Sequence, residues 1–377
     1  MTTPLHWPTA EGRLSGQVNL DGRDMIMLSS NDYLGLAGDQ RVIDGAHRAL
    51  DTYGAGIGLN PSIALTRVHR ELADELAAYL GTEAVLLFNS CASANCATLQ
   101  TLADTPQSTI VSDEYNHASI VDGCRLARGR TSVYRHDDLA SLEGLTDGLA
   151  NDARTLLVTD GVFSMEGSVA RLDRLQPLAD RVGAHLVVDE SHAIGVIGPT
   201  GRGSVEHHRS RPSTIRTGTF SKALGAGLGG FLAGPKDVVD DVGARGRFFI
   251  FTSPMPAATA GAALAAIRLI RDDGSRLERL AANVARFRGG MKDTGWDLLD
   301  SPGPIVPVML HDDDRALRVA ATLRDLGIFT AAFSFPVVPR GTARIRVQIS
   351  AAHTDDHIDT AIEAFARAAT LDDQTRS

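Results

Sequence analysis

Strand-like and helix-like segments alternate along the middle of this chain, and that alternation restricts the fold more than any other feature. Short runs rich in aliphatic residues lie at 84–88, 108–113, 155–161, 185–190, 213–220 and 229–234. Helical stretches, such as 117–128 and 171–183, lie between most of them. Strands that are joined by helices form a mostly parallel sheet with helices on both faces. The sequence therefore predicts an α/β fold.

The segments that flank this alternation show other patterns. Residues 1–50 predict an arm, a short strand pair around GRDMIMLSS and a helix. Later in the chain we expect a long alanine-rich helix at 256–288, followed by strands and helices in an α+β arrangement. The expected division is an N-terminal arm and helix at 1–50, a large domain at 51–255 and a small C-terminal domain at 256–377.

Charge and composition argue against several classes of partner. The net charge is −9 and no block of basic residues occurs, so nucleic acid and acidic membrane surfaces are poor partners. The three cysteines, Cys91, Cys96 and Cys124, lack metal-ligand spacing, which favours a reduced cytoplasmic protein without a metal site. No apolar run of about 18 residues occurs, and the N-terminus has no apolar segment, so we expect neither a membrane span nor export.

Polar side chains gather where the predicted strands end. In an open α/β sheet the ligand binds outside the carboxyl ends of the strands. One strand ends in VVDESHAIG, which carries Asp189 and His192, and another runs into TGTFSKALG, which carries Lys222. A third runs into NSCASAN, whose small polar residues open a helix. The sequence therefore predicts an acid, an imidazole, an amine and a helix N-terminus at one edge of the sheet.

Each of these features also has a purely structural interpretation. An aspartate at the end of a buried strand often caps a helix or forms a salt bridge, and a single histidine is more often structural than catalytic. Taken alone, Lys222 is most simply a surface charge, and NSCASAN is most simply a helix N-cap. Their expected position at one edge of the sheet favours a functional site.

The glycine-rich segment FSKALGAGLGG allows two interpretations. Gly225, Gly227 and Gly230 fit the G-x-G-x-x-G pattern of dinucleotide-binding loops. That pattern requires glycines that follow a first strand and open a helix, whereas these glycines lead into the strand-like GGFLAG. We therefore favour a backbone that passes close to a reactive Lys222. A non-catalytic or dinucleotide-binding protein is the weaker alternative.

Pyridoxal 5′-phosphate is a cofactor that needs these groups together. It requires an amine that holds it as an imine, and a carboxylate that keeps its pyridine nitrogen protonated. It also requires a group beside its phenolate oxygen, a ring stacked on one face, and helix-terminal N–H groups for its phosphate. Lys222, Asp189 and His192, together with NSCASAN, supply most of these groups. The sequence therefore predicts a pyridoxal phosphate enzyme.

Five segments make the chain resemble a known family. They are NHASIVDG, TDGVFSMEG, VVDESHAIGVIGPTGRG, TGTFSKALG and PVVPRGTARIRVQISAAHT. In combination and order they are similar to those of the α-oxoamine synthases, which are fold-type I pyridoxal phosphate enzymes. The similarity runs from NDYLGL at 31–36 to AAHTDDHID at 351–359. The family includes 8-amino-7-oxononanoate synthase and glycine C-acetyltransferase, and the last segment most resembles the latter.

The resemblance implies roles for the residues around the cofactor ring. Lys222 would carry the cofactor as an imine and move the α-proton of the substrate. Asp189 would pair with the pyridine nitrogen, and His192 would face the phenolate oxygen with Ser164 nearby. His117 would stack on the ring and could donate a proton to the thioester carbonyl.

The resemblance also implies how the phosphate is held. The backbone amides of Cys91 and Ala92, together with Thr219, would bind it. Thr252 and Ser253, in FIFTSP, would reach the phosphate of the other subunit, which implies a homodimer.

Two further residues are implied at the substrate. Arg346 would clamp the amino-acid carboxylate, a task that suits a bidentate guanidinium. Arg344 shares a strand face with Arg346, so the residues alone do not choose between them. Asn31 would approach the substrate from the neighbouring chain.

The reaction that the resemblance implies is a decarboxylative condensation. An amino acid reacts with an acyl thioester of coenzyme A or a carrier protein, and yields an α-aminoketone, carbon dioxide and the free thiol. The alternative is an aminotransferase or another fold-type I enzyme that acts on an amino acid. Asn60 and Ala64 stand where the family usually has an arginine and a glycine near the substrate, so the identities of the amino acid and the acyl group stay open.

Overall fold

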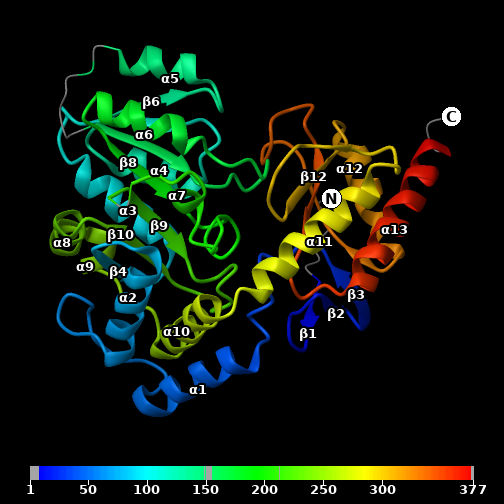
Figure 1. The fold of residues 1–377 in the computed structure, drawn as a ribbon, viewed down its shortest axis with the longest axis horizontal. Helices are drawn as coiled ribbons and strands as arrows, with labels where there is room; N and C mark the ends of the chain where they lie inside the picture. Colours follow the sequence, from blue (N-terminus) through cyan, green and yellow to red (C-terminus); the bar gives the residue numbers. More distant parts are fainter. Residues whose placement is uncertain (1–7, 148, 150–154, 212, 375–377) are drawn as a thin grey trace, which may run out of the picture. The chain divides into compact units, whose positions relative to one another are not determined.

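The computed structural model describes residues 8–147, 149, 155–211 and 213–374. The chain divides into two compact units (Figure 1). The larger unit comprises Asp39–Ser164 and Ser168–Gly274, and the smaller unit comprises Met1–Gly38, Met165–Gly167 and Ser275–Ser377. The division expected at residues 50 and 255 stays a prediction, because these units group the chain by contact and not by its order.

A seven-stranded sheet, counted over the described residues, forms the centre of the larger unit. In the order β4-β10-β9-β8-β7-β5-β6, its strands are β4 (Ala84–Phe88), β10 (Gly230–Gly234), β9 (Ile215–Thr219), β8 (His185–Asp189), β7 (Thr155–Asp160), β5 (Thr109–Asp113) and β6 (Arg130–Tyr134). Strands β5 to β9 are parallel, and β10 is antiparallel to both β4 and β9. The predicted α/β fold with a mostly parallel sheet is confirmed.

Strand β6 is the strand of this sheet that the sequence interpretation missed. It lies at the edge of the sheet beside β5, and only Tyr134 among its residues is buried. An edge strand that faces solvent does not need the apolar run by which the other strands were recognised. Its sequence, RTSVY, therefore gives a weak signal.

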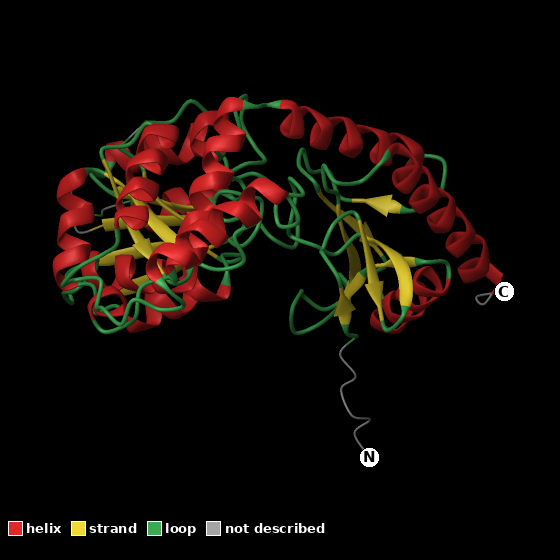
Figure 2. Cartoon of the chain, turned by 90° about the horizontal axis from the view of Figure 1, so that it is seen from below, coloured by secondary structure: helices red, strands yellow, loops and turns green. Residues whose placement is uncertain are grey.

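Helices cover both faces of this sheet, as Figure 2 shows for the larger unit. Leu156 and Val158 of β7 pack in one apolar cluster, and Leu157 between them packs in another, because successive side chains of a strand point to opposite faces. The helices of the larger unit are α1 (Gln40–Tyr53), α2 (Arg67–Leu80), α3 (Cys91–Leu102), α4 (Ala118–Leu126), α5 (Leu139–Thr146), α6 (Leu172–Arg181), α7 (Ser204–His207), α8 (Lys236–Arg245), α9 (Arg247–Ile250) and α10 (Ala257–Asp272).

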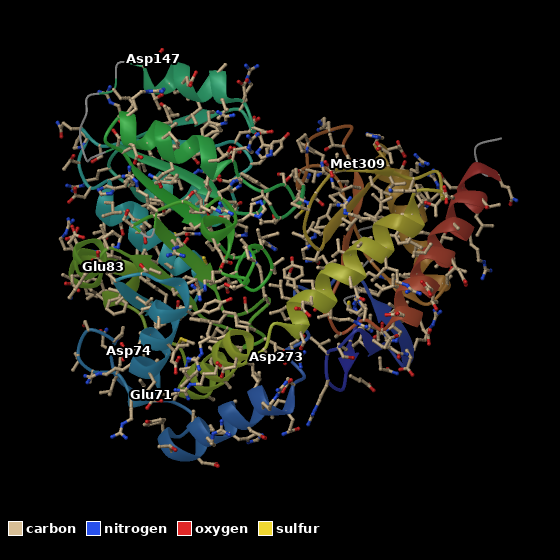
Figure 3. All side chains as sticks on the ribbon, in the orientation of Figure 1. Glu71, Asp74, Glu83, Asp147, Asp273 and Met309 are labelled. Carbon is tan, nitrogen blue, oxygen red and sulfur yellow. The ribbon has the colours of Figure 1, made fainter. Side chains whose placement is uncertain are left out.

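The prediction of one long helix at 256–288 is wrong, because the structure has two helices in this segment. Helix α10 ends at Asp272, and α11 (Ser275–Met291) begins after Asp273 and Gly274. Asp273, labelled in Figure 3, has an extended backbone with φ −142° and ψ 105°. Aspartate and glycine are both poor helix formers, and the pair ends the helix without a proline. Among the described residues, no helix is long and apolar enough to cross a membrane.

The smaller unit joins the start of the chain to its end. The described residues of this unit form two four-stranded sheets, in the orders β1-β2-β3-β13 and β11-β12-β15-β14. Their strands are β1 (Ala10–Glu11), β2 (Gln17–Leu20), β3 (Arg23–Met27), β11 (Asp297–Leu298), β12 (Ile305–Met309), β13 (Ile328–Phe329), β14 (Ala331–Phe333) and β15 (Arg344–Gln348), with helices α12 (Asp313–Asp325) and α13 (Asp355–Gln374). Strand β13 pairs with β3, which explains why the N-terminal strands belong to this unit.

Candidate active site

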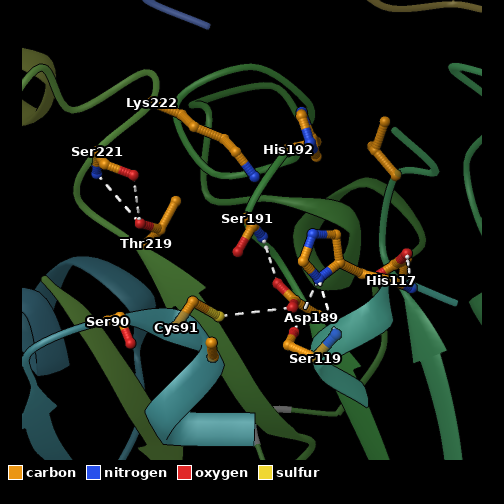
Figure 4. A pocket seen from close by; sticks show the side chains of 13 residues that line it. Ser90, Cys91, His117, Ser119, Asp189, Ser191, His192, Thr219, Ser221 and Lys222 are labelled. Carbon is orange, nitrogen blue, oxygen red and sulfur yellow. Dashed lines mark hydrogen bonds between the residues drawn. The ribbon is translucent and has the colours of Figure 1, made fainter. Parts of the chain in front are cut away.

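A cavity of about 190 Å³ opens at the carboxyl ends of β7, β8 and β9 in the larger unit (Figure 4). Seven of the residues singled out in the sequence line it: Cys91, Ala92, His117, Asp189, His192, Thr219 and Lys222. They come from four separate segments of the chain, and the parallel sheet brings these segments to one edge. The predicted convergence of acid, imidazole, amine and helix N-terminus is therefore present.

Asp189, the last residue of β8, is the buried carboxylate of this cavity, with 4 % of its surface exposed. Its Oδ1 accepts from the Ser191 N–H at 2.9 Å, and its Oδ2 accepts from Asn95 Nδ2 at 2.7 Å and from Cys91 Sγ at 3.4 Å. Burial alone raises the pKa of Asp189, but the Lys222 charge and these donors together hold that pKa below its ordinary value. The cavity therefore contains an ionised carboxylate.

Lys222 lies in the turn that follows β9. The Gly225 N–H donates to the Lys222 carbonyl at 2.9 Å, which closes the turn. Figure 4 shows the Lys222 side chain extended into the cavity. Thr219 Oγ1 lies 2.8 Å from Ser221 Oγ and donates to the Gly229 carbonyl at 3.0 Å, so its hydroxyl is fixed at the end of the strand.

The start of helix α3 forms another wall of the cavity. Ser90 caps the helix, and its Oγ accepts from the Ser93 N–H at 3.1 Å. The first N–H groups of a helix have no partner within the helix, so those of Cys91 and Ala92 can bind an anion. A Cβ atom on Gly230 would lie 2.3 Å from the Cys91 nitrogen, so only glycine lets β10 pass this close to the helix start. This close approach is to the start of α3, whereas the approach to Lys222 that the sequence favoured stays a prediction.

His117 caps helix α4 and stands on the opposite wall. Its Nδ1 lies 2.8 Å from Ser119 Oγ and accepts from the Ser119 N–H at 3.2 Å. Asn95, on α3, donates from Nδ2 to the same Ser119 Oγ at 2.9 Å. His117 as a whole is exposed, but desolvation of its ring in the cavity lowers the pKa of His117. Asn95 and Ser119 were not singled out in the sequence, because the contact that joins them is invisible in the two separate segments.

Asp160, the last residue of β7, is a second carboxyl in the cavity wall that was not predicted. Its Oδ2 accepts from the His117 backbone N–H at 3.0 Å. Burial, followed by the like charge of Asp189, raises the pKa of Asp160 well above its ordinary value. The two carboxyls of the cavity therefore have pKa values that are shifted in opposite directions. Ser164, expected beside His192, does not line the cavity.

Thr252 and Ser253 lie beside the start of α3 in the same chain but do not line the cavity. Asn89 Nδ2 donates to Thr252 Oγ1 at 2.8 Å, and Asn89 Oδ1 accepts from Ser93 Oγ at 2.7 Å. The nearby loop is held by Asn60, whose Nδ2 donates to the Ile250 carbonyl.

Arg346 and Asn31 are linked through Gln348 within the smaller unit. The Arg346 guanidinium lies over the Phe333 ring at 4.7 Å and donates from NH2 to Gln348 Oε1 at 3.3 Å. Gln348 Nε2 then donates to Asn31 Oδ1 at 2.6 Å. Gln348, buried at the end of β15, thus joins the two expected substrate residues of one chain. This link was not predicted.

Arg344, the competing arginine, has a different environment. It is 3 % exposed, and its NH1 donates to Glu166 Oε1 at 2.9 Å and to the Met165 carbonyl at 3.0 Å. Its charge is therefore balanced by a carboxylate of the same unit.

The chain is similar to known proteins, and these similarities show its family. The sequence pattern of the family "Aminotransferase class I and II" matches residues 23–365. The chain is 39 % identical over 353 residues to 8-amino-7-oxononanoate synthase of Symbiobacterium thermophilum, covering 92 % of this chain and 89 % of the relative. It is 38 % identical over 354 residues to 8-amino-7-oxononanoate synthase 1 of Bacillus subtilis, covering 93 % and 90 %.

Solved structures are similar over nearly the whole chain. A serine palmitoyltransferase from S. paucimobilis with a bound PLP–myriocin aldimine matches with a TM-score of 0.93 and 30 % identity, covering 97 % of this chain and 93 % of that one. An 8-amino-7-oxononanoate synthase from Francisella tularensis matches with a TM-score of 0.79 and 26 % identity, covering 92 % and 98 %.

Proposed function

The chain belongs to the α-oxoamine synthases, within the aminotransferase class I and II family, and from that premise we propose which of its residues perform the reaction. The protein is a pyridoxal phosphate-dependent C-acyltransferase of fold type I. It condenses an amino acid with an acyl thioester and releases carbon dioxide and the free thiol. When bound, the cofactor withdraws electrons from the carbon next to the substrate amino group.

The cavity fits this cofactor. The Asp189 carboxylate suits a protonated pyridine nitrogen, because the Lys222 charge and three hydrogen-bond donors favour its ionised form. The N-terminus of α3, with the Cys91 and Ala92 amides and Thr219, suits a phosphate. His192 lines the same cavity and is the proposed partner of the phenolate oxygen, with Ser164 as a proposed neighbour outside the cavity lining.

Lys222 is the proposed base of the reaction. Its amine would first hold the cofactor, then take the proton from the substrate α-carbon and later return a proton to the product. The observation that carries this proposal is the arrangement of one amine and one ionised, buried carboxylate in a single cavity at the strand ends.

Arg346 is the proposed partner of the substrate carboxylate. Arg344 is occupied by Glu166, so a substrate carboxylate would have to displace a buried ion pair to reach it. Gln348 joins Arg346 to Asn31, which supports a carboxylate site formed with Asn31 of the same chain and not of the neighbouring one.

The experiment that tests the function measures carbon dioxide and free thiol from the holoenzyme. Both products are expected in equal amounts, and only when an amino acid and an acyl-CoA are present together. An aminotransferase would instead form a 2-oxo acid from the amino acid alone. Lys222→Ala should abolish both the products and the absorption band of the lysine-bound cofactor. The control is Lys236→Ala, because Lys236 is exposed and paired with Asp240.

A homodimer is the proposed assembly. Leu59, Ile63 and Phe251 expose 42 %, 78 % and 73 % of their surfaces, and the bond from Asn60 to the Ile250 carbonyl holds their two segments together. Exposed apolar residues that gather on one face mark an interaction surface. In a dimer built there, the neighbouring Thr252 and Ser253 would reach the partner's phosphate site.

Light scattering of the purified protein tests the assembly. A dimer is expected, and the double variant Ile63→Asp and Phe251→Asp should yield monomers. Val133→Asp is the matched control, because Val133 is 59 % exposed on the edge strand β6, away from the patch. A wild-type monomer would disprove this assembly. We also propose a cytoplasmic location, which the three free thiols of the structure support.

A further inference from the structure

The hydrogen bonds behind His117 determine which of its ring nitrogens carries a proton. We propose that Asn95 and Ser119 hold His117 as a neutral imidazole protonated on Nε2, so that it donates a hydrogen bond to the substrate without giving up its proton. The role at the substrate rests on the proposed function, whereas the protonation state does not. Asn95 and Ser119 are then positioning residues for His117.

The orientation of the Asn95 amide is the first step. Its Oδ1 accepts from Thr217 Oγ1 at 2.5 Å, and its Nδ2 donates to Asp189 Oδ2 at 2.7 Å and to Ser119 Oγ at 2.9 Å. An ionised carboxylate only accepts hydrogen bonds, so the amide nitrogen must face Asp189. Asn95 is 2 % exposed, and all its hydrogens are used inside the protein.

The direction of the Ser119 hydroxyl follows from Asn95. Because Ser119 Oγ accepts from Asn95, its single hydrogen is available for His117 Nδ1, which lies 2.8 Å away. The Ser119 backbone N–H, which can only donate, points at the same Nδ1 from 3.2 Å. Two donors therefore meet at Nδ1, which must be the unprotonated nitrogen of the ring.

The second ring nitrogen has the opposite character. A neutral imidazole with an unprotonated Nδ1 carries its hydrogen on Nε2. Figure 4 shows this nitrogen on the side of the ring that faces away from Ser119, within the cavity. His117 therefore presents an N–H donor to a bound substrate.

The charges around the ring agree with a neutral imidazole. Asp160, Asp189, Lys222 and His192 line the same cavity. Burial lowers the pKa of His117 most, Asp189 opposes this, and Lys222 lowers that pKa further. The negative charge of Asp189 is already shared among Asn95, Ser191 and Cys91, so it does not require a charged imidazole.

This state changes what His117 does in the reaction. Loss of the Nε2 proton would turn this neutral imidazole into an imidazolate, and a neutral imidazole is too weak an acid to lose that proton readily, even with the two Ser119 donors at Nδ1. In the condensation, negative charge develops on the thioester carbonyl oxygen. When the C–S bond breaks, the carbonyl double bond re-forms and the charge leaves on the thiolate sulfur. The Nε2–H would stabilise the charge on the carbonyl oxygen by a hydrogen bond, and no proton would leave His117.

Nuclear magnetic resonance of the holoenzyme with nitrogen-labelled histidine tests the protonation state directly. His117→Gln identifies the His117 signals by their loss. We expect an unprotonated Nδ1 and a protonated Nε2 through the whole pH range in which ordinary histidines titrate. A charged His117 at neutral pH, or a proton on Nδ1, would overturn the proposal. The measurement needs no substrate, so it stands or fails separately from the reaction.

Substitution of Ser119 tests the positioning role. Ser119→Ala removes one donor from Nδ1, so the His117 signals should begin to titrate and the two tautomers should mix. The kcat should fall about ten- to a hundredfold with little change in KM, because the donor is misplaced in the transition state. Ser119→Thr, which keeps the hydroxyl, should restore the tautomer. Ser132→Ala, on β6, is the control for loss of a serine hydroxyl elsewhere. Unchanged signals in Ser119→Ala would disprove the role of this hydroxyl.

Discussion

Asp160 and Asp189 occupy equivalent places, and their pKa values are shifted in opposite directions. They end the neighbouring parallel strands β7 and β8 and pair with each other in register. Their exposed fractions, 5 % and 4 %, are nearly equal. Yet the pKa of Asp160 is raised and the pKa of Asp189 is lowered.

The donors around each carboxylate explain the difference. Asp189 receives hydrogen bonds from Ser191, Asn95 and Cys91, and Lys222 adds a favourable charge. Asp160 receives the His117 backbone N–H on Oδ2 and faces the negative charge of Asp189. Strand position and burial therefore do not set ionisation. The charges and donors that face each carboxylate do, and they shift the pKa values of two neighbouring acids in opposite directions.

The largest effect is expected when the charge of Asp189 is removed. Asp189→Asn keeps the shape but cannot hold a protonated pyridine nitrogen, so carbon dioxide release should fall about 10³-fold. The absorption spectrum should still show lysine-bound cofactor, because Lys222 is unchanged. Activity within tenfold of the wild type would contradict the role given to this carboxylate.

A smaller effect is expected when Asp189 keeps its charge but loses a donor. Asn95→Leu removes the hydrogen bond to Asp189 Oδ2, which is worth about 1.5–3 kcal/mol, or roughly 10- to 100-fold in rate. The pKa of Asp189 should rise, so the acid limb of the pH–rate profile should move to higher pH. Thr98→Val is the matched control, because Thr98 is also buried and polar on α3 but its Oγ1 has no hydrogen-bond partner among the described residues. Equal profiles for the two variants would show that Asn95 does not support Asp189.

The sequence identified residues that line the cavity more readily than the residues that support them. Asp189, His192 and Lys222 could be placed because strand ends of a parallel sheet meet at one edge, and this depends only on local patterns. Asn95 joins Ser119, Asp189 and Thr217, which are 24, 94 and 122 residues away in the chain. No local pattern contains such contacts, so the network appears only in the folded chain.

The same limit explains the errors in the fold. The buried strands were recognised by their apolar runs, and the mostly parallel sheet was predicted from the helices that join them. Strand β6 is mostly exposed and lacks such a run, while the break at Asp273 lies in a sequence that otherwise favours helix. The raised pKa of Asp160 could not be predicted either, because the sequence shows the same strand-end aspartate there as at Asp189.

The pH dependence of folding should separate the two carboxyls in protein freed of its cofactor. The pKa of Asp160 is higher in the folded protein than in the unfolded chain. The contribution of Asp160 to the free energy of unfolding should therefore fall as pH rises above the ordinary aspartate pKa, because the unfolded chain ionises first. The pKa of Asp189 is lower in the folded protein than in the unfolded chain. Asp189 should therefore raise the free energy of unfolding above the ordinary aspartate pKa, and this contribution should disappear as pH falls through the pKa of the folded state. Denaturant unfolding of Asp160→Asn at several pH values measures the first of these.

The variant's advantage over the wild type should be absent in acid and grow towards neutral pH. Near neutral pH, Asp160→Asn should raise the free energy of unfolding by about 1.4 kcal/mol for each unit that separates the folded and unfolded pKa values of Asp160. Asp189→Asn should show the opposite trend, with its largest loss of stability near neutral pH. A constant difference between Asp160→Asn and the wild type would mean that Asp160 is ionised in the folded protein.

The smallest effect on the reaction is expected for Asp160→Asn. The raised pKa of Asp160 favours its neutral form, which an asparagine resembles, and the asparagine Oδ1 can still accept the His117 backbone N–H. The rate of carbon dioxide release should therefore change by roughly twofold, or about 0.5 kcal/mol. Asp160→Leu removes the acceptor as well, so it should be slower than Asp160→Asn and should disturb the His117 resonance signals. If Asp160→Asn were as inactive as Asp189→Asn, the reaction would need a charge on both strands, and the division between a neutral and an ionised acid would fail.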